Sequence, residues 1–167
     1  DLGMPNARFK IELIQSETYL YNGKDQLDFL FTANKGSGFL TLKKAASGGE
    51  LSRIMLAIKS ILSNYQQLPT IMFDEIDTGV SGEIAHKMAS IMEQMSLSMQ
   101  VFSITHLPQI AAKGQSHFKV YKEDIGETTV TALKKLSNEE RVLEIAQMLG
   151  GKEVSDSAVA HAQQLLN

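Results

Sequence analysis

Two adjacent acids follow a short apolar stretch in the middle of the chain. Pro69 precedes residues 70–73, and Asp74 and Glu75 come directly after them. Such a run predicts a buried parallel strand, and α/β sheets bind ligands at the carboxyl ends of their strands. Neighbouring carboxylates repel each other, so a cation or polar partner usually holds them. The pair predicts either a site where Asp74 orients Mg²⁺ and Glu75 is the general base, or a strand end emerging into solvent.

A Ser-Gly-Gly-Glu sequence precedes this strand. Gly48 and Gly49 lack a Cβ, so main-chain N–H groups there can approach an anion closely, and the dipole of a following helix adds attraction. Ser47 can donate its hydroxyl to the same oxygen atoms. By itself the sequence is more typical of a helix N-cap beside a glycine turn. In combination with the two acids, it favours a phosphate site and phosphoanhydride hydrolysis.

A histidine follows the next apolar run. Residues 101–104 predict another short strand, which continues into Thr105 and His106. At a carboxyl edge beside the two acids, this imidazole could hydrogen-bond a γ-phosphate or its attacking water. We interpret the remaining histidines as surface or satisfied core residues; they are His86, His117 and His161.

Helical patterns precede both strands and must position these groups. The first helical face contains Leu51, Ile54, Met55, Ile58, Ile61 and Leu62, and the second contains Ile84, Met88, Ile91, Met92 and Met95. Alternation of helix and strand predicts βαβ units and a parallel sheet. Methionines at helical spacing are more typical of a core than of a binding surface.

The flanking segments predict antiparallel hairpins. Residues 9–13 and 27–31 alternate apolar and polar side chains around a turn at 22–24, before a loop at 34–38. Residues 118–122 and 128–133 predict a second hairpin.

Two amphipathic helices are predicted to close the chain. The first begins at a capping box of Ser137 and Glu140 and ends at Gly150 and Gly151, and the second begins near Ser155.

The order of these motifs resembles an ABC-type ATPase head of the SMC-like branch, and within it the RecN family of bacterial DNA double-strand-break repair ATPases. The matching segments are Ser-Gly-Gly-Glu-Leu-Ser-Arg at 47–53, Phe-Asp-Glu-Ile-Asp-Thr-Gly-Val-Ser-Gly at 73–82, Ile-Thr-His-Leu-Pro-Gln-Ile-Ala at 104–111 and Met-Leu-Gly-Gly at 148–151. The resemblance extends from about residue 34 onward. It implies an α/β fold: the carboxyl-terminal lobe of a P-loop NTPase head, with a mainly parallel sheet flanked by helices and an additional β-rich edge.

The resemblance also implies a role for the glycine segment. Ser47, Gly48, Gly49 and Glu50 would form the signature motif, which grips the γ-phosphate of ATP held by the opposite head of a dimer. The commoner ABC signature begins with Leu and ends with Gln, whereas this one has Ala46 and Glu50. That departure fits the SMC-like branch and leaves the role of Glu50 open.

The other motif residues receive family roles in the same way. Asp74 would be the Walker B residue that binds Mg²⁺, and Glu75 would be the catalytic base. Asp77 would lie at the centre of the D-loop across the dimer interface, and His106 would be the switch histidine.

A P-loop requires Gly-x-x-x-x-Gly-Lys-Ser/Thr, and the chain does not contain it. Gly23-Lys24 is followed by Asp25, with Thr18 at the place of the first glycine. In SMC-like proteins the P-loop lies in an amino-terminal segment beyond a long coiled coil. We therefore expect residues 1–167 to be one half of a split head, inactive alone, whose partners are the amino-terminal half, a second head and, through the full-length protein, DNA.

Composition limits the class of protein. The chain has 167 residues, 43% hydrophobic and 21% charged, and no cysteine, which fits one soluble α/β domain without disulfides. A net charge of −3 argues against a broad DNA-binding face. No membrane-spanning stretch or signal peptide is visible, so we expect a cytoplasmic protein. The family resemblance implies that it is associated with the nucleoid.

Three other interpretations stay open. The chain could be a noncatalytic docking or dimerisation module with an ABC-like fold, although such a module would have no chemical need of Asp74, Glu75 and His106. It could be the head segment of another SMC-like protein, or a transporter ATPase subunit. The Glu-ended signature argues against the transporter, and the run at residues 77–82 argues against a generic SMC head.

Overall fold

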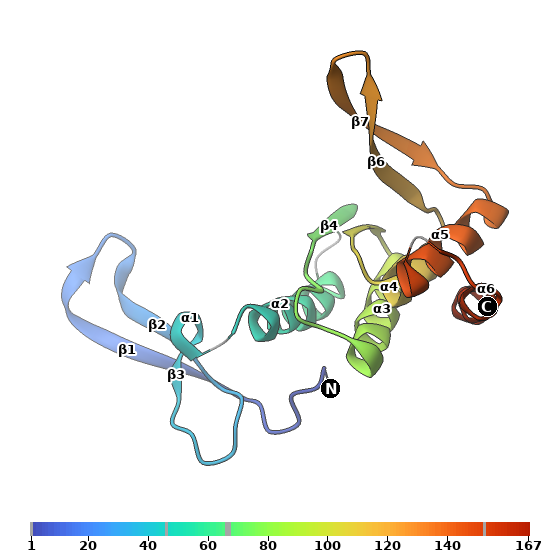
Figure 1. Cartoon of the computed structure of the whole chain (residues 1–167). Coiled ribbons are helices and arrows are strands. Elements are labelled where there is room, and N and C mark those ends of the chain that lie inside the picture. The colour runs from blue at the N-terminus through green and yellow to red at the C-terminus, as the bar shows by residue number, and fades with distance from the viewer. Residues whose placement is uncertain (1, 46, 66–67, 152) are drawn as a thin grey trace.

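The computed structural model describes residues 2–45, 47–65, 68–151 and 153–167 (Figure 1). Within these ranges the strands form three separate sheets, of three, two and two strands. In chain order the elements are β1 (Arg8–Leu20), β2 (Gly23–Thr32), β3 (Leu40–Thr41), α1 (Leu42–Ala45), α2 (Gly48–Ser63), β4 (Thr70–Asp74), α3 (Gly82–Ser96), β5 (Gln100–Ile104), α4 (Pro108–Lys113), β6 (Phe118–Ile125), β7 (Thr128–Lys135), α5 (Asn138–Gly150) and α6 (Asp156–Leu166).

Strands β1 and β2 form a long antiparallel hairpin that extends away from α2 and the helices that follow it, with only the short α1 beside it (Figure 1). Both predicted strands are confirmed and are longer than predicted. Leu20 pairs with Gly23, whose φ of 117° suits glycine, so the turn lies at residues 21–22, slightly before its predicted place. The strands continue beyond the alternating pattern because main-chain pairing does not require apolar side chains.

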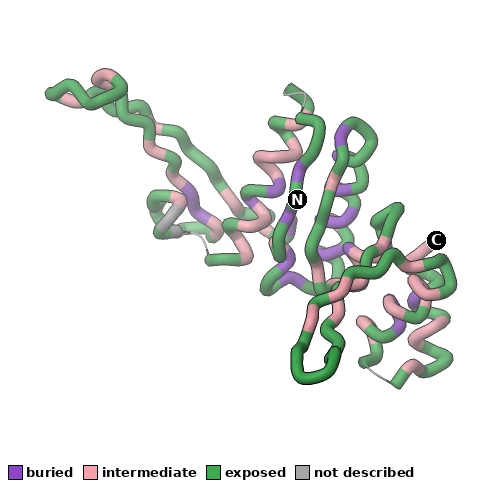
Figure 2. The backbone as a smooth tube through the Cα atoms, turned by 90° about the horizontal axis from the view of Figure 1, so that it is seen from above, coloured by how far each residue is buried: buried purple, intermediate pink, exposed green. Residues whose placement is uncertain are grey.

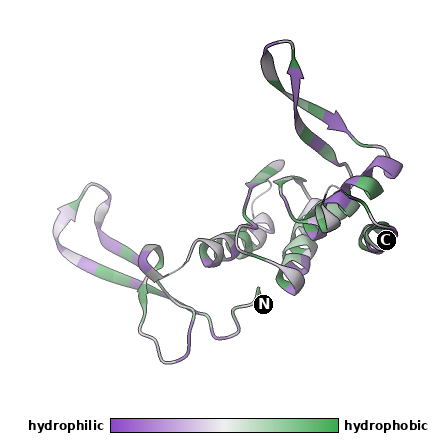
Figure 3. Cartoon of the chain, in the orientation of Figure 1, coloured by the Kyte–Doolittle hydropathy of each residue, from purple (hydrophilic) through white to green (hydrophobic). Residues whose placement is uncertain are grey.

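Apolar and polar residues alternate along this hairpin (Figure 3), and the strand register puts the apolar ones on one face as a ladder. Its cross-strand pairs are Phe9 with Phe31, Ile11 with Phe29, and Leu13 with Leu27. Cross-strand partners share a face, yet only Phe31 is buried, and the other five side chains are exposed. Most of this apolar face therefore contacts solvent in the described chain.

The main core lies between α3 and the two parallel strands β4 and β5 (Figure 2). The predicted core role of the methionine face is confirmed, since Met88, Met92 and Met95 are buried. Phe73 packs against them from β4, and Leu2 joins the same cluster from the start of the chain. The βαβ unit thus forms as the periodicity predicts.

The opposite face of β4 and β5 is not covered. Side chains alternate across a strand, and while Ile71 and Phe73 are buried, Met72, Phe102 and Ile104 are exposed. Helices therefore cover one side of this parallel sheet within the described residues.

The helix predicted over the first apolar face is confirmed as α2, but most of that face is exposed within the described chain. Ile54 is buried, but Leu51, Met55, Ile61 and Leu62 are exposed. Leu56, which the predicted face did not include, is fully buried and packs in the main core. Helix α2 turns the Leu56 side toward the core, so the broader apolar stripe faces solvent.

The last elements form a second small core. Ala112, Ile145, Ala146 and Ala162 are buried together where α4, α5 and α6 meet. The predicted hairpin and both closing helices are confirmed, including the capping box of α5. Helix α4 was not predicted because six residues are too few to show a helical period.

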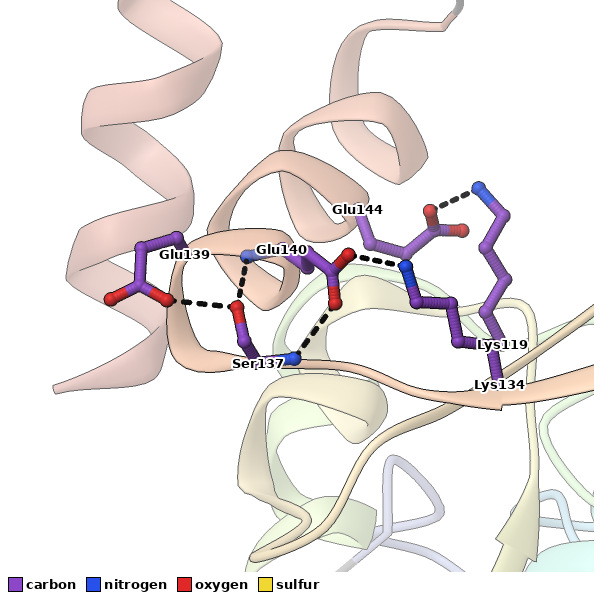
Figure 4. A network of polar contacts seen from close by, with 6 residues as sticks. All are labelled: Lys119, Lys134, Ser137, Glu139, Glu140 and Glu144. Atoms are coloured by element: carbon purple, nitrogen blue, oxygen red, sulfur yellow. Dashed lines mark hydrogen bonds and ion pairs between the residues drawn. The ribbon is translucent and has the colours of Figure 1, made fainter.

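A polar network holds the β6–β7 hairpin against the start of α5 (Figure 4). The Ser137 amide donates to Glu140 at 3.0 Å, and the other carboxylate oxygen of Glu140 accepts from Lys134. Lys119 of β6 pairs with Glu144 one turn further along the helix. Hairpin and helix are therefore joined at two points.

No helix within the described residues is long and apolar enough to cross a membrane.

Candidate functional site

The two acids lie at the carboxyl end of β4, next to β5. Asp74 pairs in register with Ile104, and the Glu75 amide donates to the Ile104 carbonyl at 3.1 Å. Both acidic side chains are exposed. Parallel pairing thus brings the acids to the edge from which His106 also emerges.

Glu75 has an unusual backbone. Its φ is +45°, and it is the only non-glycine residue with positive φ in the described ranges. A side chain in this left-handed region costs about 1–2 kcal/mol. The Glu75 carbonyl accepts from the Thr78 hydroxyl at 2.9 Å and from the Thr78 amide at 3.4 Å. The chain thus turns sharply at the acid, and Thr78 closes the turn.

Asp77 points into the molecule. It is 1% exposed, and its Oδ2 accepts a hydrogen bond from the Thr105 hydroxyl. Its Oδ1 is buried without a hydrogen-bond partner in the described chain. The structure therefore places the Asp77 carboxylate beneath the β5 end, where it faces its own chain rather than an outside ligand.

His106 lies directly beside this carboxylate. Its Nδ1 is 3.7 Å from Asp77 Oδ2, while the side chain is 64% exposed. The next residue is fixed as well, since the Leu107 amide donates to the Thr105 hydroxyl at 3.0 Å. One edge of the ring faces the buried acid and the rest faces solvent.

The signature segment, residues 47–50, begins helix α2 as a full capping box. The Glu50 amide donates to the Ser47 hydroxyl at 3.4 Å, and the Ser47 amide donates to the Glu50 carboxylate at 2.8 Å. Both contacts satisfy N–H groups that a helix start leaves unpaired. The structure thus gives Glu50 a local structural role that the sequence left open.

Gly49 connects this segment to the loop after β4. A Cβ at Gly49 would lie 3.2 Å from the Thr78 carbonyl and 3.5 Å from Arg53 Nη1, whereas one at Gly48 would meet nothing within 4 Å. The glycine therefore permits close approach of the α2 start to the loop. Through this contact the signature segment, the acids and His106 belong to one region.

The carboxylates at this edge are too few to hold a metal ion by themselves, but they suit a metal ion that is also bound by phosphate oxygens. Across the described ranges there is no group of three His, Cys, Asp or Glu residues that could hold an ion. Magnesium usually takes one or two carboxylates and fills its remaining positions with phosphate oxygens and water. Exposed Asp74 could supply one such ligand.

Two residues of this site have no role in the sequence-based prediction. Both threonines lie within the matched motifs, and their hydroxyls hold the Asp77 carboxylate (Thr105) and the turn at Glu75 (Thr78). Only the position of Thr105 beside His106 could have drawn attention to it, because its partner lies 28 residues away.

Proteins similar in sequence are named DNA repair protein RecN. One from Bacillus subtilis is 48% identical over 144 residues, covering 86% of this chain and 25% of the relative. Relatives from Treponema pallidum and Haemophilus influenzae are 42% and 41% identical, each covering 99% of this chain and 30% of its own length. The chain thus spans between a quarter and a third of these relatives. No protein-family profile matches it.

Solved structures of SMC heads share the fold. An Smc head domain with a coiled coil and joint from Pyrococcus yayanosii aligns with a TM-score of 0.67 and 20% identity, covering 86% of this chain and 26% of that one. A structure from a study of ATP-driven dimerization and DNA stimulated activation of SMC ATPases gives 0.59 and 21%, covering 87% of this chain and 83% of the other. These alignments show an SMC-head α/β fold.

Proposed function

Because this chain is a RecN-related sequence with the fold of an SMC ATPase head, we propose that it is the carboxyl-terminal segment of the ATPase head of a DNA repair protein. The observation that carries the proposal is the convergence of three separate motifs at one edge of the parallel sheet. The Glu75 amide donates a hydrogen bond to the Ile104 carbonyl, and Gly49 lies close to the Thr78 carbonyl. The Asp77 carboxylate lies beside Thr105 and His106.

In the proposed mechanism, ATP with Mg²⁺ supplies the phosphoanhydride and the cation that neutralises its charge. Asp74 faces solvent at the strand end and would hold the metal directly or through its water. The Glu75 carboxylate, one residue further along the turn, would accept the proton of the attacking water. His106 would hydrogen-bond that water or the γ-phosphate from the neighbouring strand end.

The signature segment would bind the γ-phosphate of a nucleotide held by a second head. Gly48 lies open at the α2 start, where N–H groups and the helix dipole attract anions. The Ser47 oxygen accepts the Glu50 amide, which leaves its hydroxyl hydrogen to donate to phosphate. In this arrangement Glu50 preserves the helix start through its bond with the Ser47 amide.

The uncovered apolar surfaces support an intramolecular partner. Met72, Phe102 and Ile104 on the open face of the parallel sheet, and Leu51 and Met55 on α2, would be buried by another layer. The relatives are three to four times as long as the region matched here. We assign these surfaces to the amino-terminal half of the same head, which would bring the P-loop.

The remaining elements of the proposal concern the whole protein. Recombinational double-strand-break repair, DNA binding and a location at the nucleoid in the cytoplasm would belong to the full-length molecule. The acidic balance of this segment, with a net charge of −3, argues against a broad DNA-binding face here and supports a proposal in which other parts of the protein make most of the DNA contacts.

ATP turnover in a two-part complex tests the proposal. The chain is produced with a separate P-loop segment of the same protein, and hydrolysis is measured for the chain alone, the P-loop segment alone and the purified complex. We expect turnover only in the complex and its loss in Glu75→Gln, which removes the base but keeps size and polarity. Absence of turnover in a verified, folded complex, or wild-type turnover in Glu75→Gln, contradicts the catalytic role and favours a docking module.

A further inference from the structure

We propose that Thr105 and Asp77 are positioning residues that fix the tautomer and orientation of the His106 ring. In this arrangement Nδ1 carries the proton and faces the buried carboxylate, which leaves Nε2 as the acceptor on the exposed side. The catalytic meaning of this orientation rests on the proposed function, whereas the orientation itself can be measured in the chain alone.

The Thr105 hydroxyl is both a hydrogen-bond donor and an acceptor. It donates to Asp77 Oδ2 and accepts the Leu107 amide at 3.0 Å. One hydroxyl therefore fixes two things around His106. It holds the backbone of Leu107, directly after the histidine, and it holds the Asp77 carboxylate that faces the ring. Serine could make both bonds, but valine could make neither.

The Asp77 carboxylate favours a donor on the ring. At 1% exposure it has lost most of its water, and the Thr105 hydroxyl is its one hydrogen-bond donor among the described residues. A buried carboxylate with an unsatisfied oxygen is strongly stabilised by a nearby N–H dipole. His106 Nδ1, at 3.7 Å, is the nearby ring nitrogen, although this distance exceeds that of a direct hydrogen bond.

This orientation would matter for the proposed chemistry. A neutral imidazole has one N–H and one acceptor nitrogen, and the surroundings decide which is which. With Nδ1–H toward Asp77, the exposed Nε2 can accept a hydrogen bond from the attacking water but cannot donate one to the γ-phosphate, so this orientation selects the water of the two contacts proposed for His106. Asp77 thus acts through His106, which differs from the direct contact across a dimer interface that the family resemblance implies.

Nitrogen-15 NMR of the histidine-labelled chain tests the proposal directly. Spectra are recorded at about pH 8.5, where an ordinary histidine is neutral, and His106 is assigned by its absence in His106→Gln. We expect the Nδ1–H form to predominate in the wild type. Asp77→Asn and Thr105→Val should shift the tautomer ratio toward Nε2–H by about threefold or more, while Thr105→Ser should retain the wild-type ratio.

A matched control uses another Thr–Asp hydrogen bond. Thr129 donates to Asp124 at 2.6 Å on the exposed β6–β7 hairpin, far along the chain from His106. Thr129→Val should leave the His106 spectrum unchanged. Because Thr105→Val removes two part-buried hydrogen bonds and could unfold the chain, the near-isosteric Asp77→Asn decides the question. An unchanged tautomer ratio in folded Asp77→Asn overturns the proposal.

Kinetics in the two-part complex separate positioning from packing. We expect Asp77→Asn to lower kcat about tenfold with little change in KM, because a misoriented ring affects the reacting state more than binding, and Thr105→Ser to restore activity. An equal loss in Thr105→Ser and Thr105→Val contradicts the positioning role. If the wild-type complex has no turnover, the proposed function fails while the NMR result still decides the orientation.

Discussion

The amide of Glu75 donates to the carbonyl of Ile104, which continues the parallel pairing of β4 and β5 one residue beyond the end of β4. The bond holds the acid at the sheet edge although its backbone has turned into the left-handed region. Glu75 is therefore held in a costly conformation by its neighbours, as is common at functional sites.

The conformation of Glu75 predicts a reversed order of stability between glycine and alanine. Gly adopts positive φ without steric cost, whereas Ala keeps a Cβ. We expect Glu75→Gly to be more stable than Glu75→Ala by about 1 kcal/mol. Urea denaturation of both variants measures the difference, with the same pair at exposed Glu93 inside α3 as the control, where Ala should be more stable. An alanine variant as stable as the glycine variant at position 75 contradicts this reading.

The two glycines of the signature segment should respond differently to alanine. A Cβ at Gly48 meets open space, but one at Gly49 would lie 3.2 Å from the Thr78 carbonyl. We expect Gly48→Ala to be neutral or slightly stabilising and Gly49→Ala to be less stable than it by about 1 kcal/mol. Thermal unfolding of the matched pair measures this. Equal stabilities would indicate that the loop at Thr78 yields without cost.

Glu50 should behave as a capping residue in the isolated chain. Its carboxylate accepts the Ser47 amide at 2.8 Å, and an amide oxygen can accept the same bond. We expect Glu50→Gln to change the free energy of unfolding little and Glu50→Ala to lower it by about 0.5–1 kcal/mol. The same pair of variants at Glu140, which caps α5 in the same way and also pairs with Lys134, gives a comparison in which the charge has a second partner. A large loss of stability in Glu50→Gln would show that its charge is required.

His117, at the base of the β6–β7 hairpin, should make stability depend on pH. Burial lowers its pKa below 6.5, and the nearby Arg141 lowers it further, while Glu144 opposes the shift. The unfolded chain then binds the proton more readily, so the contribution of His117 is fully present above about pH 6.5 and is lost as the pH falls through the folded-state pKa. Urea midpoints at about pH 7.5 and about pH 5.5 should therefore differ more in the wild type than in His117→Gln. An identical difference in both proteins contradicts the prediction.

The sequence predicted elements whose signals are local. The capping box at Ser137 and the methionine period on α3 each lie within a few residues, and both are confirmed. Helix α2 shows the limit of such signals. Apolar residues cover so much of its surface that two different sides could pack against neighbours. Periodicity alone does not indicate which of the two sides is buried within the described chain.

The site shows the same limit. The strand-end positions of Asp74 and His106 follow from parallel pairing, which the βαβ pattern indicates. The inward turn of Asp77 does not, because it depends on a positive φ at Glu75 and a hydroxyl at Thr105, distant in sequence. Turn geometry and polar contacts between distant residues produce no periodic pattern in the sequence, so periodicity does not predict them.

The exposed apolar ladder of β1 and β2 has a consequence for hydrogen exchange. Apart from the short pairing of β2 with β3, the hairpin is a two-stranded ribbon with little cover, which is marginally stable. Its amides should therefore exchange through local opening, whereas those of α3 should require global unfolding. A protein segment that covered this ladder would slow exchange in β1 and β2 before it altered α3. Deuterium uptake by the hairpin, measured by mass spectrometry, would thus report docking without any probe attached to the protein.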